Sequence, residues 1–294
     1  MPEQPLFDEQ FLRKLEYLRI VAKKVFSGQF SAERRAKKIG SGLEFADHRD
    51  YAPGDDFRYL DWNLYGRLEK LLLRLFEEEE DLSITFLLDV SRSMFMGSPV
   101  KADYARRVAA ALAYVGLANL DRVTILPFSA GLSGGLAPKR GKRQVFAVLE
   151  YLAGLQPGGV TDLEGSFREF VHRTRRRGLA VVLSDFFDAR GFERGLNYLR
   201  YNRFDVYVVQ VLDAAELSPR IAGDMRMVDV ETGDAREVTV SPAILAEYAR
   251  RMRTFCDALE RYCRESSLGY VRAVTSVPVD VLVLSVFRAG GFLR

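Results

Sequence analysis

The sequence predicts an α/β fold in which a mainly parallel sheet carries helices on both faces. From Leu82 onward, short apolar runs rich in β-branched residues alternate with segments of helical periodicity. Several of these runs end directly in a polar residue, as Ile84 to Leu88 does at Asp89. Strands that alternate with helices form right-handed crossover units, and strands covered on both faces are almost continuously apolar.

Each element follows from its own pattern. The predicted strands are 83–88, 123–126, 179–183, 206–211 and 268–273, with 132–138 as an edge strand. The predicted helices between and after them are 101–119, 144–152, 163–174, 192–201 and 279–287. Small residues such as Ala109 and Gly116 line one face of 101–119, so this helix is expected to lie close to the sheet. A further helix, 242–265, has Ser241 as its N-cap and proline in its first turn.

Two segments depart from this alternation. Residues 225–230 and 236–240, joined by Glu231-Thr232-Gly233-Asp234, predict a β-hairpin insertion. Ahead of the sheet, 8–26 predicts an amphipathic helix, and 40–81 is dense in turn formers and charge and is expected to be an irregular wrap with short extended pieces. We therefore divide the chain into residues 1–81, the helix and wrap, and residues 82–294, the α/β domain.

Composition and cysteine spacing restrict the classes of partner and the cellular compartment that we expect. The net charge of +3 over 294 residues does not favour nucleic acid or an anionic membrane as a partner. Cys256 and Cys263 lie two turns apart on a predicted helix, about 10 Å along its axis, which is too far for a disulfide. Free thiols predict a reducing compartment, and the most apolar C-terminal stretch, 279–287, is too short to span a membrane. We expect a soluble, cytoplasmic protein.

Polar residues at strand ends are the strongest functional signal. Asp89, Ser91 and Ser93 directly follow the first strand, and ligands of open α/β sheets bind beyond the carboxyl ends of strands. Their oxygens suit a hard cation such as Mg²⁺, with Mn²⁺ or Ca²⁺ as alternatives. Thr161, after a glycine-rich loop, and Asp185, after a later strand, are expected to complete the site. Thr161 and Asp162 are also suitable helix caps, so this second role stays open.

Asp89-x-Ser91-x-Ser93, Thr161 and Asp185 together resemble the metal-ion-dependent adhesion site of von Willebrand factor A domains. That resemblance implies a Rossmann-like fold in which the two serines ligate the metal and Asp89 and Thr161 act directly or through water. It also implies that Asp185 acts through water and that a partner's carboxylate completes the coordination. The chain is still closer to the bacterial family called domain of unknown function 58. Its shared motifs are Gly42-Leu43-Glu44-Phe45, Arg49-x-Tyr51-x-Pro53-Gly54-Asp55-Asp56, Asp61-Trp62, Leu212 to Glu216 and Val228 to Gly233.

Members of this family are often encoded beside MoxR-type AAA ATPases. The resemblance thus implies a non-enzymatic, metal-dependent interaction module that works with such an ATPase in complex assembly, with an acidic client as ligand. We assign no catalytic and no organic-cofactor residues.

Two alternative functions stay open. The Asp-led loop also suits a metal-dependent phosphate-ester hydrolase, although no general base is evident. The polar cluster from Gly42 to Trp62 suits a scaffold that needs no metal.

Overall fold

The computed structural model describes residues 6–29, 44–77 and 82–288, which form two compact units. The larger unit contains the residues up to Lys23 and those from Leu82 onward. The smaller unit contains residues of the segment 24–81. The predicted boundary at Leu82 therefore coincides with a change of unit, whereas the N-terminal helix up to Lys23 groups with the larger unit.

In the described part of the larger unit, six strands form one sheet in the order β10-β7-β6-β3-β4-β5. Their bounds are β3 Ser83–Asp89, β4 Arg122–Phe128, β5 Leu136–Arg140, β6 Leu179–Ser184, β7 Asp205–Leu212 and β10 Gly269–Val274. All neighbouring pairs are parallel except β4 with β5, which is antiparallel. The prediction of an α/β fold with a mainly parallel sheet is confirmed.

The strand order creates a switch point between β3 and β6. From β3 the chain moves outward to β4 and β5, and it then returns to the other side of β3 to build β6, β7 and β10. Connections on the two sides of such a point diverge, which leaves a crevice beyond the carboxyl ends of the two central strands. Those ends are occupied by Asp89 and Ser184.

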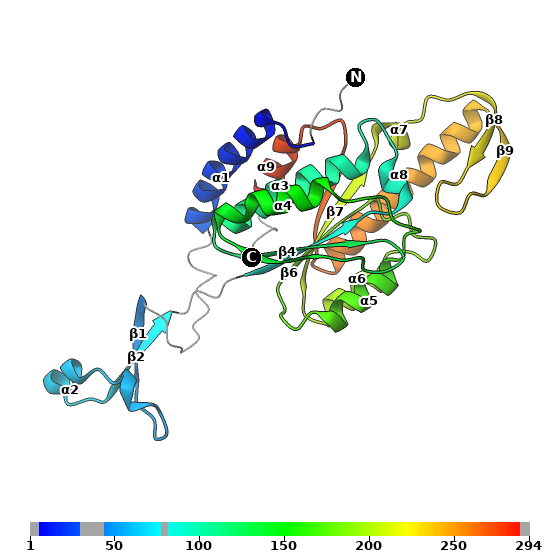
Figure 1. Ribbon diagram of the computed structural model, residues 1–294. Coiled ribbons are helices and arrows are strands. Elements are labelled where there is room, and N and C mark those ends of the chain that lie inside the picture. Colours follow the sequence, from blue (N-terminus) through cyan, green and yellow to red (C-terminus); the bar gives the residue numbers. More distant parts are fainter. Residues whose placement is uncertain (1–5, 30–43, 78–81, 289–294) are drawn as a thin grey trace. The chain divides into compact units, whose positions relative to one another are not determined.

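Helices cover both faces of the sheet (Figure 1). One face carries α3 (Lys101–Ala118), with α4 (Val145–Ala153), α9 (Val279–Arg288) and α1 (Glu9–Gln29) around it. The other carries α5 (Leu163–Arg173), α6 (Glu193–Tyr201) and α8 (Pro242–Glu265), whose apolar residues pack with Leu87 and Val182 of the sheet. The close approach expected of α3 is confirmed at Gly116, where a Cβ would lie 2.8 Å from Ile84 Cδ1.

Helix α1 joins the larger unit through an apolar face. Phe11, Leu15 and Leu18 are buried at helical spacing. Tyr114 of α3 donates a hydrogen bond to Glu16 at 2.6 Å, and Lys14 pairs with Asp280 of α9 at 3.0 Å. This packing explains why α1 groups with the sheet even though the polar segment after it separates the two in sequence.

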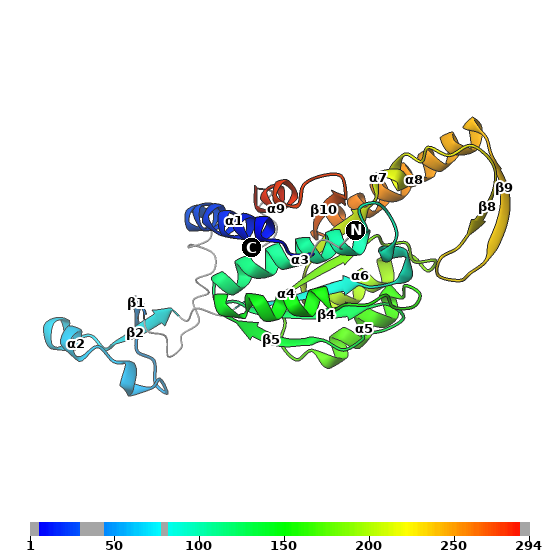
Figure 2. The same cartoon turned by 45° about the horizontal axis from the view of Figure 1, so that its top comes forward.

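The predicted hairpin insertion is also present. Strands β8 (Gly223–Val228) and β9 (Ala235–Val240) pair antiparallel and stand beside α8, outside the central sheet (Figure 2). The short helix α7 (Ala214–Leu217), which we did not predict, follows β7 and is closed by a capping box between Asp213 and Glu216.

The smaller unit is more regular than expected. Strands β1 (Glu44–Asp50) and β2 (Leu72–Glu77) pair antiparallel, and the 3-10 turn η1 (Phe57–Tyr59) and helix α2 (Trp62–Leu68) lie between them in the chain. The predicted short extended pieces are present, but their antiparallel pairing and helix α2 were not predicted, because residues 51–71 separate the two strands and neither carries a local hairpin signal. Salt bridges join charged side chains of this unit, including Arg49 with Asp55 and Arg58 with Asp56, both at 2.6 Å.

Two further expectations concern the larger unit. Cys256 and Cys263 are buried and free, which confirms that they do not form a disulfide. Within residues 6–29, 44–77 and 82–288, no helix has the length and apolar character needed to cross a membrane.

Candidate functional site

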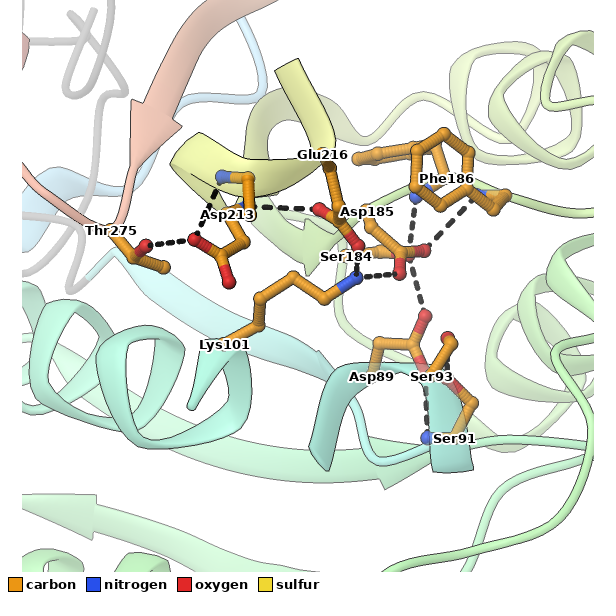
Figure 3. A network of polar contacts seen from close by, with 12 residues as sticks. Asp89, Ser91, Ser93, Lys101, Ser184, Asp185, Phe186, Asp213, Glu216 and Thr275 are labelled. Carbon is orange, nitrogen blue, oxygen red and sulfur yellow. Dashed lines mark hydrogen bonds and ion pairs between the residues drawn. The ribbon is translucent and has the colours of Figure 1, made fainter. Parts of the chain in front are cut away.

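The site is built around Asp89, the last residue of β3 (Figure 3). Its side chain is buried, and each carboxylate oxygen accepts a hydrogen bond. Oδ1 accepts from the backbone N–H of Ser91 at 2.8 Å, and Oδ2 accepts from the hydroxyl of Ser184 at 2.5 Å. Two central strands thus hold one carboxylate in a fixed orientation, and each oxygen keeps a lone pair for a further contact.

Ser91 and Ser93 place two hydroxyl oxygens beside this carboxylate. Ser91 precedes the 3-10 turn η2 (Arg92–Phe95), and its Oγ lies 3.1 Å from the Oγ of Ser93. Two ligands at right angles on a Mg²⁺ ion, each about 2.1 Å from it, are about 3 Å apart. The separation of the two hydroxyls therefore fits neighbouring positions around one small cation.

Asp185 follows β6 on the other side of the switch point. Its Oδ1 accepts from the backbone N–H of Phe187 at 3.1 Å, and its Oδ2 accepts from Lys101 Nζ at 2.7 Å. Between them Phe186 has φ of 64°, a conformation that bulky residues rarely adopt. The chain thus turns sharply after Asp185, which keeps the carboxylate beside the strand end.

Lys101, the first residue of α3, is the cation of this network. It is 1% exposed and donates to both Asp185 and Glu216, the latter at 2.5 Å. Burial alone would lower the pKa of Lys101, but attraction to Asp185 and Glu216 outweighs it and leaves the pKa raised. The side chain is therefore a fixed positive charge, and it offsets part of the negative charge at the strand ends.

Among the residues that the structure describes, no basic side chain forms an ion pair with Asp89. Burial, and then the charge of Asp185, raise the pKa of Asp89 to about 7, although hydrogen bonds from Ser184 and Ser91 act in the opposite direction. Two carboxylates buried at neighbouring strand ends are costly to ionise together, and a bound cation would lower that cost. The electrostatics are those of a site that is short of positive charge.

Thr161 reaches the same edge of the sheet from the loop before α5. The loop is held against the end of β3, because Gly158 N–H donates to Val90 C=O at 2.5 Å and Arg92 N–H donates to Gly159 C=O at 3.2 Å. A Cβ on Gly158 would lie 2.6 Å from Ser129 Oγ, so glycine permits this approach.

Asp162, and not Thr161, caps α5, by accepting a hydrogen bond from Gly165 N–H at 2.7 Å. The Thr161 hydroxyl is used otherwise, for it donates to Glu231.

The five predicted side chains thus come from three loops at one edge of the sheet. Asp89, Ser91 and Ser93 are joined by direct contacts, and Asp185 follows the serine that binds Asp89. Within the described ranges no three His, Cys, Asp or Glu side chains gather as a metal cluster, so a cation here would depend on hydroxyl oxygens as well as carboxylates.

Sequence reasoning did not identify Lys101, Ser184 or Glu231. Lys101 has the sequence appearance of an ordinary lysine at a helix start, and its partners lie 84 and 115 positions away. Ser184 and Glu231 were within motifs that we had noted, beside Asp185 and inside Val228 to Gly233. The motifs were a usable signal, but only the fold assigns their side chains to this site.

Comparison with known proteins gives uncharacterised relatives. Proteins of Mycobacterium bovis and Mycobacterium tuberculosis are 27% identical over 248 residues, covering 83% of this chain and 78% of theirs. An aerotolerance-related membrane protein from Bacteroides fragilis aligns in structure with 71% of this chain and 99% of its own, at 17% identity and a TM-score of 0.46. BatB from Bacteroides thetaiotaomicron aligns with 71% of this chain at 14% identity and a TM-score of 0.44.

The family model described as protein of unknown function DUF58 matches residues 47–255, which include every residue of the candidate site. The chain therefore belongs to the DUF58 family.

Proposed function

We propose that this protein is a divalent-metal-dependent protein-interaction module of the von Willebrand factor A type. Asp89, Ser91 and Ser93 would hold Mg²⁺, or Mn²⁺ or Ca²⁺ in its place, with Thr161 and Asp185 in support. The metal would supply an open coordination position for an acidic side chain of a partner. The observation that carries the proposal is the pair of hydroxyls 3.1 Å apart beside a buried carboxylate at the switch point.

The charge of the site supports a binding role. Lys101 is ion-paired with Asp185 and Glu216, which leaves Asp89 for the cation. A metal held by one carboxylate and neutral hydroxyls keeps much of its positive charge, so it attracts an anionic ligand from outside. We further propose that the partner is a MoxR-type AAA ATPase, as the family resemblance implies, and that the protein acts in the cytoplasm, as its free buried thiols favour.

The test is capture of the MoxR-type ATPase of the host organism on immobilised full-length protein, with Mg²⁺ or with a chelator. Asp89→Ala should lose capture, and so should the wild type with chelator. The matched control is Asp205→Ala, an exposed aspartate at the opposite end of the sheet, which should retain capture. Equal capture by all three proteins with and without chelator would refute the metal-dependent mechanism.

A metal-independent scaffold is the second candidate, because large apolar side chains are exposed in the smaller unit. Phe57 and Trp62 are each 61% exposed, so both aromatic side chains are accessible to a partner. The same capture experiment separates the two functions. Loss of capture in Trp62→Ala, together with its retention in Asp89→Ala, would favour the scaffold. Asp61 is unsuitable for this purpose, because it caps α2 and pairs with Arg74.

A further inference from the structure

The tip of the β8–β9 hairpin places a carboxylate on Thr161, one of the predicted site residues. Thr161 is buried, and both of its hydrogen-bond donors point to Glu231. The Thr161 backbone N–H donates to Oε2 at 3.1 Å, and the Thr161 hydroxyl donates to Oε1 at 3.0 Å. Glu231 lies 70 positions further along the chain, so the tertiary fold alone produces this bidentate contact.

The turn that presents Glu231 is well ordered by local contacts. Asp229 accepts from the backbone N–H groups of Glu231 at 2.8 Å and Thr232 at 2.9 Å, and these bonds lower the pKa of Asp229. Gly233 has φ of 80°, which allows its N–H to reach the Asp229 carbonyl at 2.9 Å. Hydrogen bonds within the turn therefore fix the backbone position of Glu231.

The Glu231 carboxylate is held by hydrogen bonds from Thr161. No lysine, arginine or histidine of the described ranges forms an ion pair with Glu231, and the same edge of the sheet already holds Asp89 and Asp185. Because Thr161 donates its hydroxyl proton to Glu231, the lone pairs of that oxygen stay available to a metal. The contact is therefore compatible with metal ligation by Thr161 and brings a further anion to it.

We propose that Glu231 is a tethered ligand of this site. Its carboxylate occupies the position that an acidic side chain of a partner takes when the partner binds. This inference rests on the proposed function. The hairpin is a displaceable cap, and a partner binds by replacing the Glu231 carboxylate with its own. The site therefore selects partners that offer a carboxylate together with enough further contacts to outcompete the internal one.

The expected effect follows from competition. An external ligand binds only the fraction of molecules whose hairpin is undocked, so its apparent Kd rises as that fraction falls. If the hairpin is docked for about nine-tenths of the time, removal of the Glu231 carboxylate tightens external carboxylate binding about tenfold. The same removal takes an anionic group from the metal, so affinity for the metal alone falls.

The experiment uses Mn²⁺ as the metal and acetate as the simplest carboxylate, with full-length protein. Water-proton relaxation measures Mn²⁺ binding, and acetate titration of the Mn²⁺-loaded protein, with chloride at equal ionic strength as reference, measures access of a carboxylate. Glu231→Ala should bind Mn²⁺ several-fold more weakly and acetate about tenfold more tightly than wild type. Glu231→Gln, which keeps the shape of the side chain, should resemble Glu231→Ala. The matched control is Glu237→Ala, an exposed glutamate of β9, which should resemble wild type.

Each outcome separates this inference from the proposed function. Normal Mn²⁺ binding with equal acetate affinity in all variants would overturn the tethered ligand and leave the metal-dependent function standing. Absence of Mn²⁺ binding in wild type and in both Glu231 variants would refute the function and the inference together. Amide hydrogen exchange of residues 229–235 adds a metal-free readout, because faster exchange in Glu231→Ala than in Glu237→Ala is required if Glu231 docks the hairpin.

Discussion

The molecule contains two clusters of charged side chains that have similar contact distances and different surroundings. At the edge of the sheet, Lys101 and Asp185 are 2.7 Å apart, with side chains 1% and 0% exposed. In the smaller unit, Arg58 and Asp56 are 2.6 Å apart, with side chains 83% and 42% exposed. The segment around Arg58 is denser in charge than the apolar strand end at Asp185, so charge density in the sequence does not indicate which pair is buried.

The difference is one of desolvation. In an exposed ion pair, each charge exchanges contacts with water for a contact with its partner, so the net gain in free energy is small. In a buried pair, the loss of one partner leaves the other charge without solvation. Burial of charge is costly, and its presence at a strand end indicates a function there more strongly than the exposed cluster does. Substitutions that separate partners should therefore have very different effects in the two places.

The largest effect is expected for Lys101→Met in the metal-free protein. The substitution leaves Asp185 buried without its cation, which costs about 3–5 kcal/mol of the free energy of unfolding. Chemical denaturation followed by circular dichroism measures the loss. The control is Lys142→Met, because Lys142 pairs with Glu16 at the surface and should change the midpoint far less.

A second variant sharpens this prediction. Adding Asp185→Asn to Lys101→Met removes the stranded charge, so part of the lost stability should return. If Lys101→Met is as stable as Lys142→Met, the buried ion pair contributes no more to the free energy of unfolding than the surface pair does. The contrast between the two clusters is then wrong.

An effect of intermediate size on stability is expected when the pH is raised. The pKa of Asp89 is raised to about 7 in the folded state, above its ordinary value of 3.8, so the folded protein binds this proton more tightly than the unfolded chain. The resulting stability is complete below the unfolded pKa and is lost as pH rises through about 7. The Tm of the metal-free protein should thus fall by a few degrees between pH 5 and pH 8 relative to Asp89→Asn. A parallel pH dependence in both proteins would contradict this assignment.

The smallest effect is expected for Arg58→Ala in the exposed cluster. Water replaces the lost partner of Asp56, so the Tm should stay within about 1 °C of the wild-type value. Differential scanning calorimetry checks this directly. A shift as large as that of Lys101→Met would show that the exposed cluster is energetically equivalent to the buried network.

Much of the fold could be predicted because its signals are local. Strand β3 is a continuous apolar run, and α8 begins at the predicted serine cap and proline. The paired strands β1 and β2 could not be predicted in this way, since their register depends on contacts across residues 51–71. Helix α1 was predicted as an element, but the unit that it joins depends on the surface that buries Leu15 and Leu18.

The candidate site shows the same division. Asp89, Ser91 and Ser93 are neighbours in the chain, so their proximity follows from a single turn. Asp185 was assigned from its strand end, which parallel pairing brings to the same edge. Lys101 had no such signal, and the motif that contains Glu231 did not indicate its contact, because a helix start and a hairpin tip reach their partners only through the packing of whole elements.

Isothermal titration of the metal-free protein with Mg²⁺ at pH 8 tests the metal site most directly. The proposal predicts one saturable binding event in wild type, with affinity reduced at least about tenfold in Asp89→Asn and in Ser91→Ala, each of which removes one oxygen ligand. Asp205→Asn should titrate as wild type does. Equal Mg²⁺ affinity in all four proteins, or no binding in any of them, would contradict the proposal that these side chains hold a divalent cation.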